Sequence, residues 1–450
     1  MSRLPLEGIR IVDTSAIFAF PYAAGVMADL GAEVIKVEGP SRVEPIRTGM
    51  LSGAYPENDP GDDPWNRTPT FHVVNRGKKS LVLDLRNPKG LKVLKELVLS
   101  ADVFLENFTP RVTRNWGMDW PNLKELKPDI IMMSNTGYGH GDGPYSDYPA
   151  VATSQEASHG LTHLTGYNGD IPSKVGQSYV DFVASWTCLF ALSMALRHRK
   201  KTGKGMWVDI GMYQLGAFHI GEFLMDWVAN GKDRSNRIGN RHPWFAPQGC
   251  YPCSGDNEWA VLSVRDDHEW EALCNTIGRS DLVNDSKYIG HANRLKNHDE
   301  LDQIISEWTK KHDKWEVMEK LQNAGIPSGP VMDSRDMNTS KHYWDRGFME
   351  KVESDDPTLG TRVLMGRPWK LSNTPISIKG PGPKLGEGNH RYIVGELGYS
   401  EEEYQELIDE TVTADKPTDT RPIPTSNLDD MVAKGVYGYW DPEYRKKLGI

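Results

Sequence analysis

Asp181 is the residue whose type and position in this sequence could most directly perform chemistry. It stands at the predicted start of a helix, residues 182–196, that is apolar on nearly every side. Aspartate is a favoured N-cap residue, so a purely structural role is one interpretation. The other role is catalytic, because a helix N-terminus keeps a carboxylate ionised and an ionised carboxylate can attack an activated carbonyl as a nucleophile. The two interpretations are compatible.

A glycine-rich segment is the second candidate. Four glycines fall within the seven residues from Gly137 to Gly143, directly after a predicted strand over residues 130–134. Glycine lets the backbone approach a ligand closely, and open α/β sheets bind ligands at the carboxyl ends of their strands. A simple surface turn explains these glycines equally well.

Other familiar chemistries lack their residues. The turn over residues 13–21 has no G-x-G-x-x-G, so we expect no nicotinamide or flavin site. Cys250 and Cys253 form an isolated C-x-x-C pair, without a second pair at zinc spacing. His159 and His163 are four residues apart but lack the carboxylate of an H-E-x-x-H pattern. We therefore predict core or surface roles for these side chains, and neither a metal nor NAD as a cofactor.

The elements that must position Asp181 alternate between strands and helices, which predicts a parallel sheet. Residues 39–69 are rich in glycine, proline, aspartate and asparagine and predict a long loop. A smaller α+β unit is expected at about residues 259–330. Strands are expected at residues 9–12, 32–37, 80–84, 103–105, 130–134, 208–212 and 260–264, and helices at 21–30, 88–99, 181–201, 217–228, 268–277, 301–310 and 315–325.

Composition excludes several classes of protein. The 450 residues carry 52 basic and 62 acidic side chains, a net charge of −10 that would repel a nucleic-acid backbone, so a polyanionic ligand needs a local basic patch. Four cysteines are too few for a disulfide-rich secreted protein. The apolar segment over residues 182–196 is shorter than the roughly 20 residues of a membrane span. We expect a cytoplasmic protein with no nucleic-acid or membrane partner.

Several ordered motifs together resemble the class III CoA-transferases, of the formyl-CoA and carnitine CoA-transferase type. The likeness spans roughly residues 5–400. Its motifs are residues 6–13, 28–38, 75–80, 83–85, 106–108, 176–181, 203–205, 239–243, 324–327 and 366–369.

The resemblance implies an α/β fold with a large Rossmann-like domain built from both chain ends, a smaller α+β domain from the middle, and two interlocked subunits. The large domain would cover residues 1–215 and 331–410. A linker or crossover at 216–255 would lead to the small domain at 256–330, and residues 411–450 would form a C-terminal extension or arm.

The resemblance also implies the reaction. Such enzymes move CoA from an acyl-CoA donor to a free carboxylic acid, and the family's catalytic aspartate falls on Asp181. Its carboxylate would attack the donor thioester to give an aspartyl–acyl anhydride, and returning CoA would form an aspartyl-CoA thioester that passes CoA to the acceptor. Coenzyme A is the only cofactor implied, as substrate and carrier. The protein partner would be a second subunit, in a homodimer or a related heterodimer.

Ten residues at or beside the positions of the family's CoA site are predicted to contact CoA. Arg76, Lys78 and Lys79 would meet the CoA phosphates, although lysines in a solvated turn would give the same pattern. The full set is Ala16, Phe18, Ala19, Arg76, Lys78, Lys79, Asn107, Phe108, Arg114 and Gly137.

This chain departs from the family at several of these places. Ala16 and Phe18 stand where some members have polar residues beside the thioester, and Phe20 where a glycine is common. These changes predict a more apolar acyl pocket, for a bulky, aromatic or dicarboxylic group. Further along, Asn115, next to Arg114, occupies the place of a basic residue, and Ala150 that of an aromatic one.

Two alternatives remain open. Related α-methylacyl-CoA racemases add a histidine about thirty residues before the aspartate, for two-base proton transfer. That place here is Ala150 or Val151, so His159 or His163 would have to substitute. The other alternative is a non-catalytic CoA-binding subunit of a heteromeric transferase.

Overall fold

The structure is a computed structural model that describes residues 4–48, 55–176, 179–233, 236–357, 359–419 and 427–450. Parts of the predicted segments at 39–69, 176–181, 216–255 and 411–450 therefore lie outside the described residues. The chain divides into two compact units. The first comprises Met1–Leu161, Lys174–Asn230 and Lys341–Ile450, and the second Thr162–Ser173 and Gly231–Ser340.

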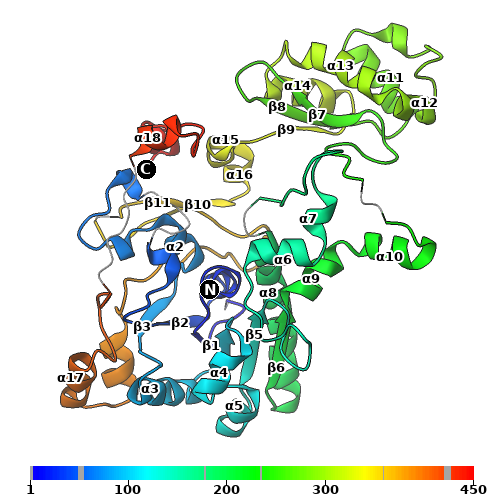
Figure 1. The fold of residues 1–450 in the computed structure, drawn as a ribbon. Coiled ribbons are helices and arrows are strands. Elements are labelled where there is room, and N and C mark those ends of the chain that lie inside the picture. Colours follow the sequence, from blue (N-terminus) through cyan, green and yellow to red (C-terminus); the bar gives the residue numbers. More distant parts are fainter. Residues whose placement is uncertain (1–3, 49–54, 177–178, 234–235, 358, 420–426) are drawn as a thin grey trace. The chain divides into compact units, whose positions relative to one another are not determined.

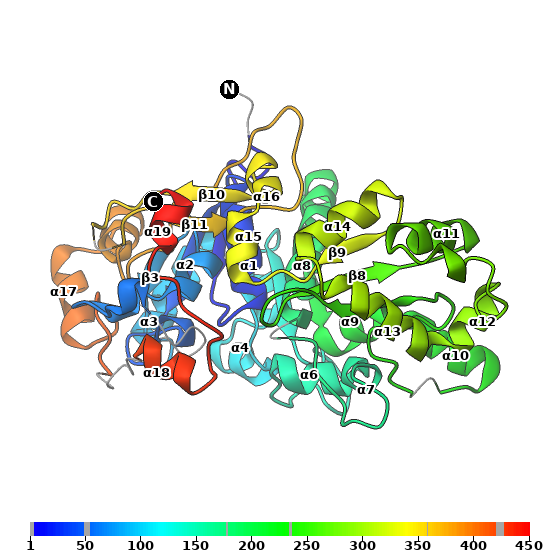
Figure 2. The ribbon, with the colours of Figure 1, turned by 90° about the horizontal axis from the view of Figure 1, so that it is seen from above.

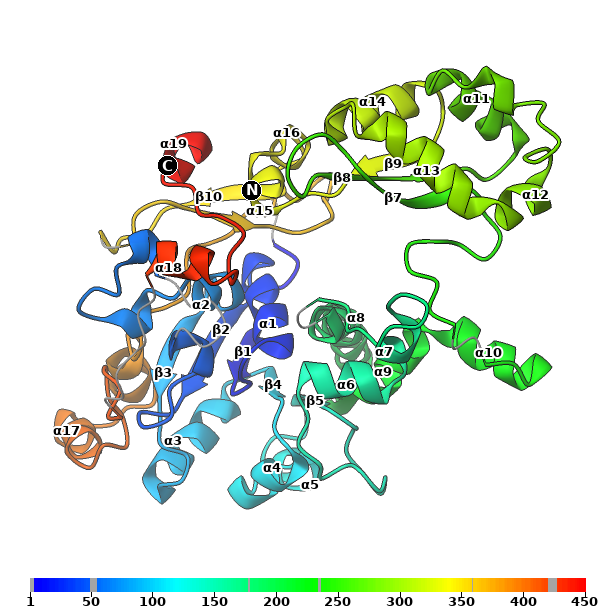
Figure 3. The same ribbon diagram turned by 45° about the horizontal axis from the view of Figure 1, so that its top comes forward.

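A six-stranded parallel sheet forms the centre of the first unit, in the order β3-β2-β1-β4-β5-β6 (Figures 1 and 3). The strand order reverses between β1 and β4, the switch point at which open α/β sheets bind ligands. The predicted parallel sheet is confirmed, and each strand lies within two residues of its predicted range. The strands are β1 Arg10–Asp13, β2 Glu33–Glu38, β3 Lys79–Val82, β4 Val103–Glu106, β5 Ile131–Thr136 and β6 Met206–Gly211.

Helices cover both faces of this sheet. Helices α1 (Ala19–Asp29) and α8 (Tyr179–Thr202) pack on one face, and α3 (Pro88–Leu99) and α17 (Glu401–Asp409) contribute to the core on the other. Successive strand residues point to opposite faces, so alternating apolar residues supply both cores. Because α17 lies beside α3, both ends of the chain build this unit (Figure 2).

The remaining elements of the first unit lie around these layers. The prediction of one helix at residues 217–228 is wrong, because the helix ends at His219, Ile220 leaves the helical conformation and a new helix starts at the flexible Gly221. The other helices and strands are α2 Pro69–Val74, α4 Pro110–Trp116, α5 Trp120–Leu126, α6 Ala152–Ser158, α9 Met212–His219, α10 Gly221–Asn230, α16 Lys341–Asp345, β10 Met349–Val352, β11 Arg362–Met365, the π-helical turn Arg391–Glu396, α18 Leu428–Ala433 and α19 Tyr444–Leu448.

The second unit contains both strands and helices. Three antiparallel strands pack against helices through a core that includes Tyr251, Trp270 and Leu321. Its elements are β7 Gln248–Pro252, β8 Trp259–Ser263, α11 Asp267–Thr276, α12 His291–Lys296, α13 His298–Thr309, α14 Lys314–Asn323, β9 Ser328–Pro330 and α15 Ser334–Thr339, while α7 Leu161–Leu164 lies where the chain first leaves the first unit.

Helix α8, with 24 residues, is the longest helix in the described part of the chain. Within the described part of the chain it is the one helix with the length and composition to cross a membrane, and 39% of its most apolar window is buried in the protein. Its buried side, with Cys188 and Leu192, packs on α1 and the sheet. Its other side leaves Phe190 and Met194 exposed.

Candidate active site

Asp181 lies in the first turn of α8. The helix begins at Tyr179, so Asp181 is not the N-cap that the structural interpretation assumed. First-turn N–H groups have no partner within the helix and carry partial positive charge, which favours the ionised carboxylate. The Ser185 hydroxyl lies 2.8 Å from the Asp181 carbonyl oxygen and 2.6 Å from that of Ala19. This contact joins the first turn of α8 to the first residue of α1.

Three helix N-termini meet beside Asp181. Ala19 begins α1, Met212 begins α9, and Val180 lies in the first turn of α8, and all three belong to one buried cluster. Because two of these residues are an alanine and a valine, the helix ends approach closely. Phe18 precedes α1 and packs edge-on against Phe182, with ring centroids 4.9 Å apart. The arrangement directs three positive dipole ends toward one region of the carboxyl edge of the sheet.

The turn between β1 and α1 is fixed by hydrogen bonds with Asn107, which follows β4. The Asn107 side-chain oxygen accepts a hydrogen bond from the Ala16 N–H, and its amide group donates to the Ala16 carbonyl oxygen, each at 2.7 Å. The next residue, Ile17, has φ +69°, which is strained for a β-branched side chain. Its N–H donates to Glu44 at 2.6 Å. Asn107 thus positions this turn, and its side chain is engaged with protein backbone.

Two buried lysines stabilise the same turn through hydrogen bonds and ion pairs. Lys36 donates to the Ser15 carbonyl oxygen and pairs with Glu44 at 2.9 Å, while Lys78 pairs with Asp13 at 2.7 Å. Burial opposes ionisation of the Asp13 carboxyl, but Lys78 and Lys36 outweigh it and lower the pKa of that carboxyl below its usual value. The β1 end therefore carries buried, paired charges.

The predicted basic cluster is divided by the fold. Arg76 is fully buried over the Tyr22 ring and pairs with Asp29 at 3.0 Å. Lys78 is buried as described above, so both charges have internal partners. Lys79 is half exposed but begins β3, at the amino end of that strand, and its nearest carboxylate is Glu387 at 3.8 Å.

Three other predicted residues lie at the carboxyl edge. Phe108 follows β4 and packs edge-on against Trp116. Arg114 projects from α4 and pairs at 2.8 Å with Asp147, and both side chains are more than half exposed. Gly137 follows β5, where an added Cβ would lie 2.3 Å from that of Ala150, so glycine is required there by close packing.

Phe20 is enclosed in the core of the first unit. Its side chain is fully buried in the core between α1, α8 and the sheet. Phe18 is the aromatic of this turn that stays partly exposed.

Two acidic residues of the site were missed in the sequence. Glu44 lies in the long loop after β2, and Glu156 on α6 accepts hydrogen bonds from the Val175 and Tyr179 N–H groups at 3.2 and 3.3 Å. Glu156 thereby anchors the segment that enters α8. Neither stands in a recognisable motif, because their partners are backbone groups brought in by tertiary folding.

The histidines and cysteines weighed above are placed as follows. His159 is buried against Gly216 of α9, and His163, in the second unit, lies 3.8 Å from Asp233. All four cysteines are free thiols. Among the described residues, no group of three or more histidine, cysteine or acidic side chains is arranged to hold a metal ion.

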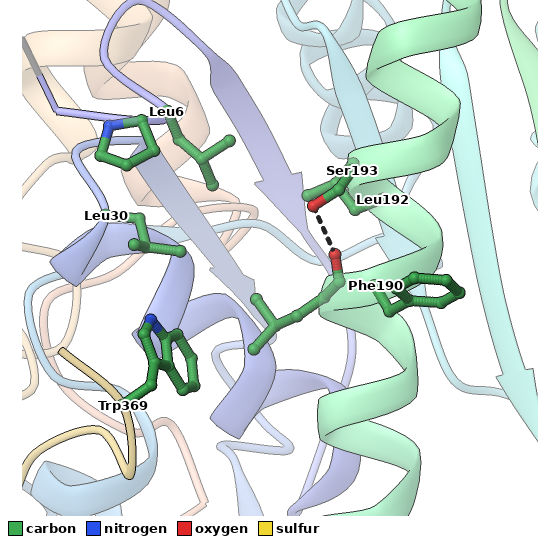
Figure 4. Close-up of a pocket in the computed structure, with 8 residues that line it drawn as sticks. Leu6, Leu30, Phe190, Leu192, Ser193 and Trp369 are labelled. Carbon is green, nitrogen blue, oxygen red and sulfur yellow. Dashed lines mark hydrogen bonds between the residues drawn. The ribbon is translucent and has the colours of Figure 1, made fainter. Parts of the chain in front are cut away.

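An apolar pocket lies elsewhere on α8 (Figure 4). Leu189 and Phe190 contribute to it, together with Leu6, Leu30 and Trp369. Leu189 is about two turns along the helix from Asp181, at 3.6 residues per turn. This pocket therefore adjoins the exposed side of α8 instead of the carboxyl edge of the sheet.

Comparison with known proteins gives consistent matches. Residues 6–389 match CoA-transferase family III. Succinyl-CoA–D-citramalate CoA-transferase of Chloroflexus aurantiacus is 31% identical over 399 residues, covering 89% of this chain and 96% of that protein. The beta subunit of succinyl-CoA–L-malate CoA-transferase from the same organism is 31% identical over 407 residues, covering 90% and 97%. The crystal structure of a CAIB/BAIF family protein from Brucella suis aligns with a TM-score of 0.78 at 28% identity, covering 88% of this chain and 100% of that one.

The strain at Ile17 predicts an unusual order of stability. Both Ile17→Gly and Ile17→Ala remove the side-chain atoms beyond the Cβ. Only alanine keeps the Cβ, which is strained at positive φ. We expect Ile17→Gly to be about 1 kcal/mol more stable than Ile17→Ala in urea unfolding. Equal stability, or a more stable alanine variant, would contradict the strained turn.

Proposed function

This chain belongs to CoA-transferase family III, and from that premise we propose that Asp181 carries CoA covalently while the enzyme transfers it from an acyl-CoA donor to a free carboxylic acid. The observation that carries the proposal is the place of Asp181, in the first turn of α8 where three helix N-termini meet. An acyl-CoA:carboxylate CoA-transferase is also what the names of its relatives describe.

The reaction is a series of acyl transfers in which bonds and charges balance. The Asp181 carboxylate attacks the thioester carbonyl, and the CoA thiolate leaves to give an aspartyl–acyl anhydride. The thiolate then attacks the aspartyl carbonyl and releases the donor acid as a carboxylate. The acceptor carboxylate attacks the carbonyl of this aspartyl-CoA thioester, and CoA thiolate leaves to give a second anhydride. CoA thiolate finally attacks the acceptor's carbonyl and regenerates Asp181.

Each step passes through an oxyanion, which needs preorganised donors. Helix α1 begins without a side-chain cap, and the N–H groups of Ala19 and Phe20 belong to its first turn. We assign the oxyanion to this helix end, which Ser185 holds against the Asp181 turn.

The phosphates of CoA require exposed cations at the carboxyl edge. Arg114 fits, because its pair with the exposed Asp147 is a surface ion pair of small net stability and can be exchanged for a phosphate. Arg42, after β2, and Arg111, at the start of α4, are exposed at the same edge. Arg76 and Lys78 instead act as positioning residues through their buried carboxylate partners.

The relatives suggest a substrate class. Succinate, malate and citramalate, which occur in their names, are short dicarboxylic acids. We propose that this chain also uses a short dicarboxylic acid, in the cytoplasm. An aromatic acyl group has less support, because Phe20 is enclosed in the core.

A second subunit is proposed to cover an apolar surface of the first unit. All residues of α10 are at least partly exposed, and Trp227 and Val228 are 62% and 75% exposed. On α9, Phe218 is 80% exposed, and Phe190 of α8 adjoins the apolar pocket. Exposed apolar patches of this kind mark protein interfaces. We propose an interlocked dimer of two copies or of this chain and a related one, since one relative is a subunit of a larger enzyme.

Covalent catalysis predicts a labelled aspartate. After incubation with succinyl-CoA, the peptide that contains Asp181 should carry the mass of CoA as a thioester. Asp181→Ala should lose the label and about 10³-fold or more of the turnover. Glu319→Ala, at an exposed carboxylate of α14, serves as the control. Full turnover by Asp181→Ala would refute the mechanism.

The division of the basic cluster predicts two different phenotypes. Arg114→Ala should raise KM for acyl-CoA about fivefold or more, with unchanged stability, because it removes an exposed charge. Lys78→Met should instead cost about 3 kcal/mol or more of unfolding free energy, because it removes the ion-pair partner of the buried Asp13 carboxylate. Steady-state kinetics and urea unfolding separate these results. The assignment fails if Arg114→Ala leaves KM unchanged.

The subunit interface predicts a change in assembly. Wild-type protein should sediment as a dimer at micromolar concentration, and Phe218→Ser combined with Trp227→Ser should shift it toward monomer, because both remove large exposed apolar surfaces. Tyr439→Ser, at an exposed aromatic of the C-terminal extension, is the matched control. Dimers that are indifferent to the double substitution would place the interface elsewhere.

A further inference from the structure

Helix α6 buries two polar side chains that the reaction described above does not use. Gln155 is fully buried and His159 is 6% exposed. Both polar atoms of the Gln155 amide and both ring nitrogens of His159 have no hydrogen-bond partner among the residues that the structure describes. The two residues are four apart on one helix face, a spacing that puts their Cβ atoms about 5–6 Å apart. We call them the α6 pair.

Two glycines leave room for the α6 pair. A Cβ at Gly137 would lie 3.0 Å from the Gln155 amide nitrogen, and one at Gly216 would lie 2.1 Å from the His159 ring. The Tyr213 N–H donates to the Gly137 carbonyl oxygen at 2.8 Å, which joins the end of β5 to the first turn of α9. The side chains of the α6 pair therefore face the carboxyl end of β5 and helix α9.

Helix α6, which carries the α6 pair, contacts the first turn of α8, which carries Asp181. Glu156, the neighbour of Gln155, binds the Tyr179 N–H, two residues before Asp181. Ala152, one turn before Glu156, packs on the cluster that contains Val180. The helix that carries the α6 pair therefore contacts the turn of α8 that carries Asp181.

The chemistry of the α6 pair selects among possible ligands. Burial lowers the pKa of His159 below its ordinary value and outweighs the opposing charge of Glu156, which favours the neutral ring at pH 7. A neutral imidazole and a primary amide each offer both donors and acceptors. A carboxylate only accepts, and its charge is costly to bury without a cation. A hydroxyl both donates and accepts, and it is neutral.

We propose that Gln155 and His159 form a subsite that binds a hydroxyl group on the acyl chain of the substrate. This inference rests on the proposed function and names a feature of its acid. Buried polar groups left unpaired are destabilising, so the free enzyme gives up stability that the hydroxylated substrate restores on binding. A site built to bond a hydroxyl discriminates strongly against the analogue that lacks it.

Matched acceptor acids test the subsite with the full-length enzyme. With succinyl-CoA as donor, the acceptors are glutarate, 2-hydroxyglutarate, 3-hydroxyglutarate and propane-1,2,3-tricarboxylate. Wild-type kcat/KM should favour one hydroxyglutarate over glutarate by about tenfold or more. Gln155→Leu should abolish that preference while its Tm stays equal or rises, because leucine fills the same space without unpaired polar atoms.

Thr153→Leu, on the exposed side of α6, should retain the preference. Gly216→Ala should weaken it by displacing the His159 ring. A wild-type enzyme that treats glutarate and both hydroxyglutarates alike would overturn the inference. A Gln155→Leu variant that keeps the preference would also overturn it, because the amide of the wild-type enzyme would then be satisfied by a bound water and not by the substrate hydroxyl. A wild-type preference for the tricarboxylate over both hydroxyglutarates would overturn it as well. Absence of any CoA thioester on Asp181 would instead refute the proposed function, and the inference with it.

Discussion

The turn between β1 and α1 depends on buried ion pairs, and the rest of the site depends on that turn. Lys36 contacts Ser15 and Glu44, and Glu44 in turn holds the strained Ile17. Asn107 fixes the preceding residue from the neighbouring strand. These contacts fix the backbone of the turn that leads into the N-terminus of α1. Ionic pairs suit this task because removing one partner leaves a buried charge, so the geometry is strongly specified.

Charge is used in two ways by this acidic chain. Arg76 and Lys78 lie inside the fold as the ion-pair partners of Asp29 and Asp13. Cations such as Arg114 remain on the surface, where their ion pairs are weak and exchangeable. A polyanionic ligand would therefore be met by a few exposed arginines and by helix N-termini, since the net charge of −10 repels it elsewhere.

Local rules of stability are broken around the carboxyl edge of the sheet. Ile17 has a positive φ, and Gln155 and His159 are buried without partners in the described structure. Departures of this kind also occur elsewhere, as at Glu57 and Trp270, but those at the carboxyl edge adjoin the proposed site, where such departures are expected.

The strand and helix order, and the position of Asp181 near a helix start, were predictable from the sequence, because apolar periodicity and glycine or proline breaks are local signals. The family was predictable too, since its motifs are short and ordered along the chain. Only the tertiary structure decided that Lys78 reaches Asp13, 65 residues away, and that Glu44 and Glu156 hold backbone groups of the site. The sequence pattern of a basic cluster is the same whether its side chains face solvent or a buried carboxylate. Burial depends on contacts between segments far apart in the sequence, which a local pattern does not contain.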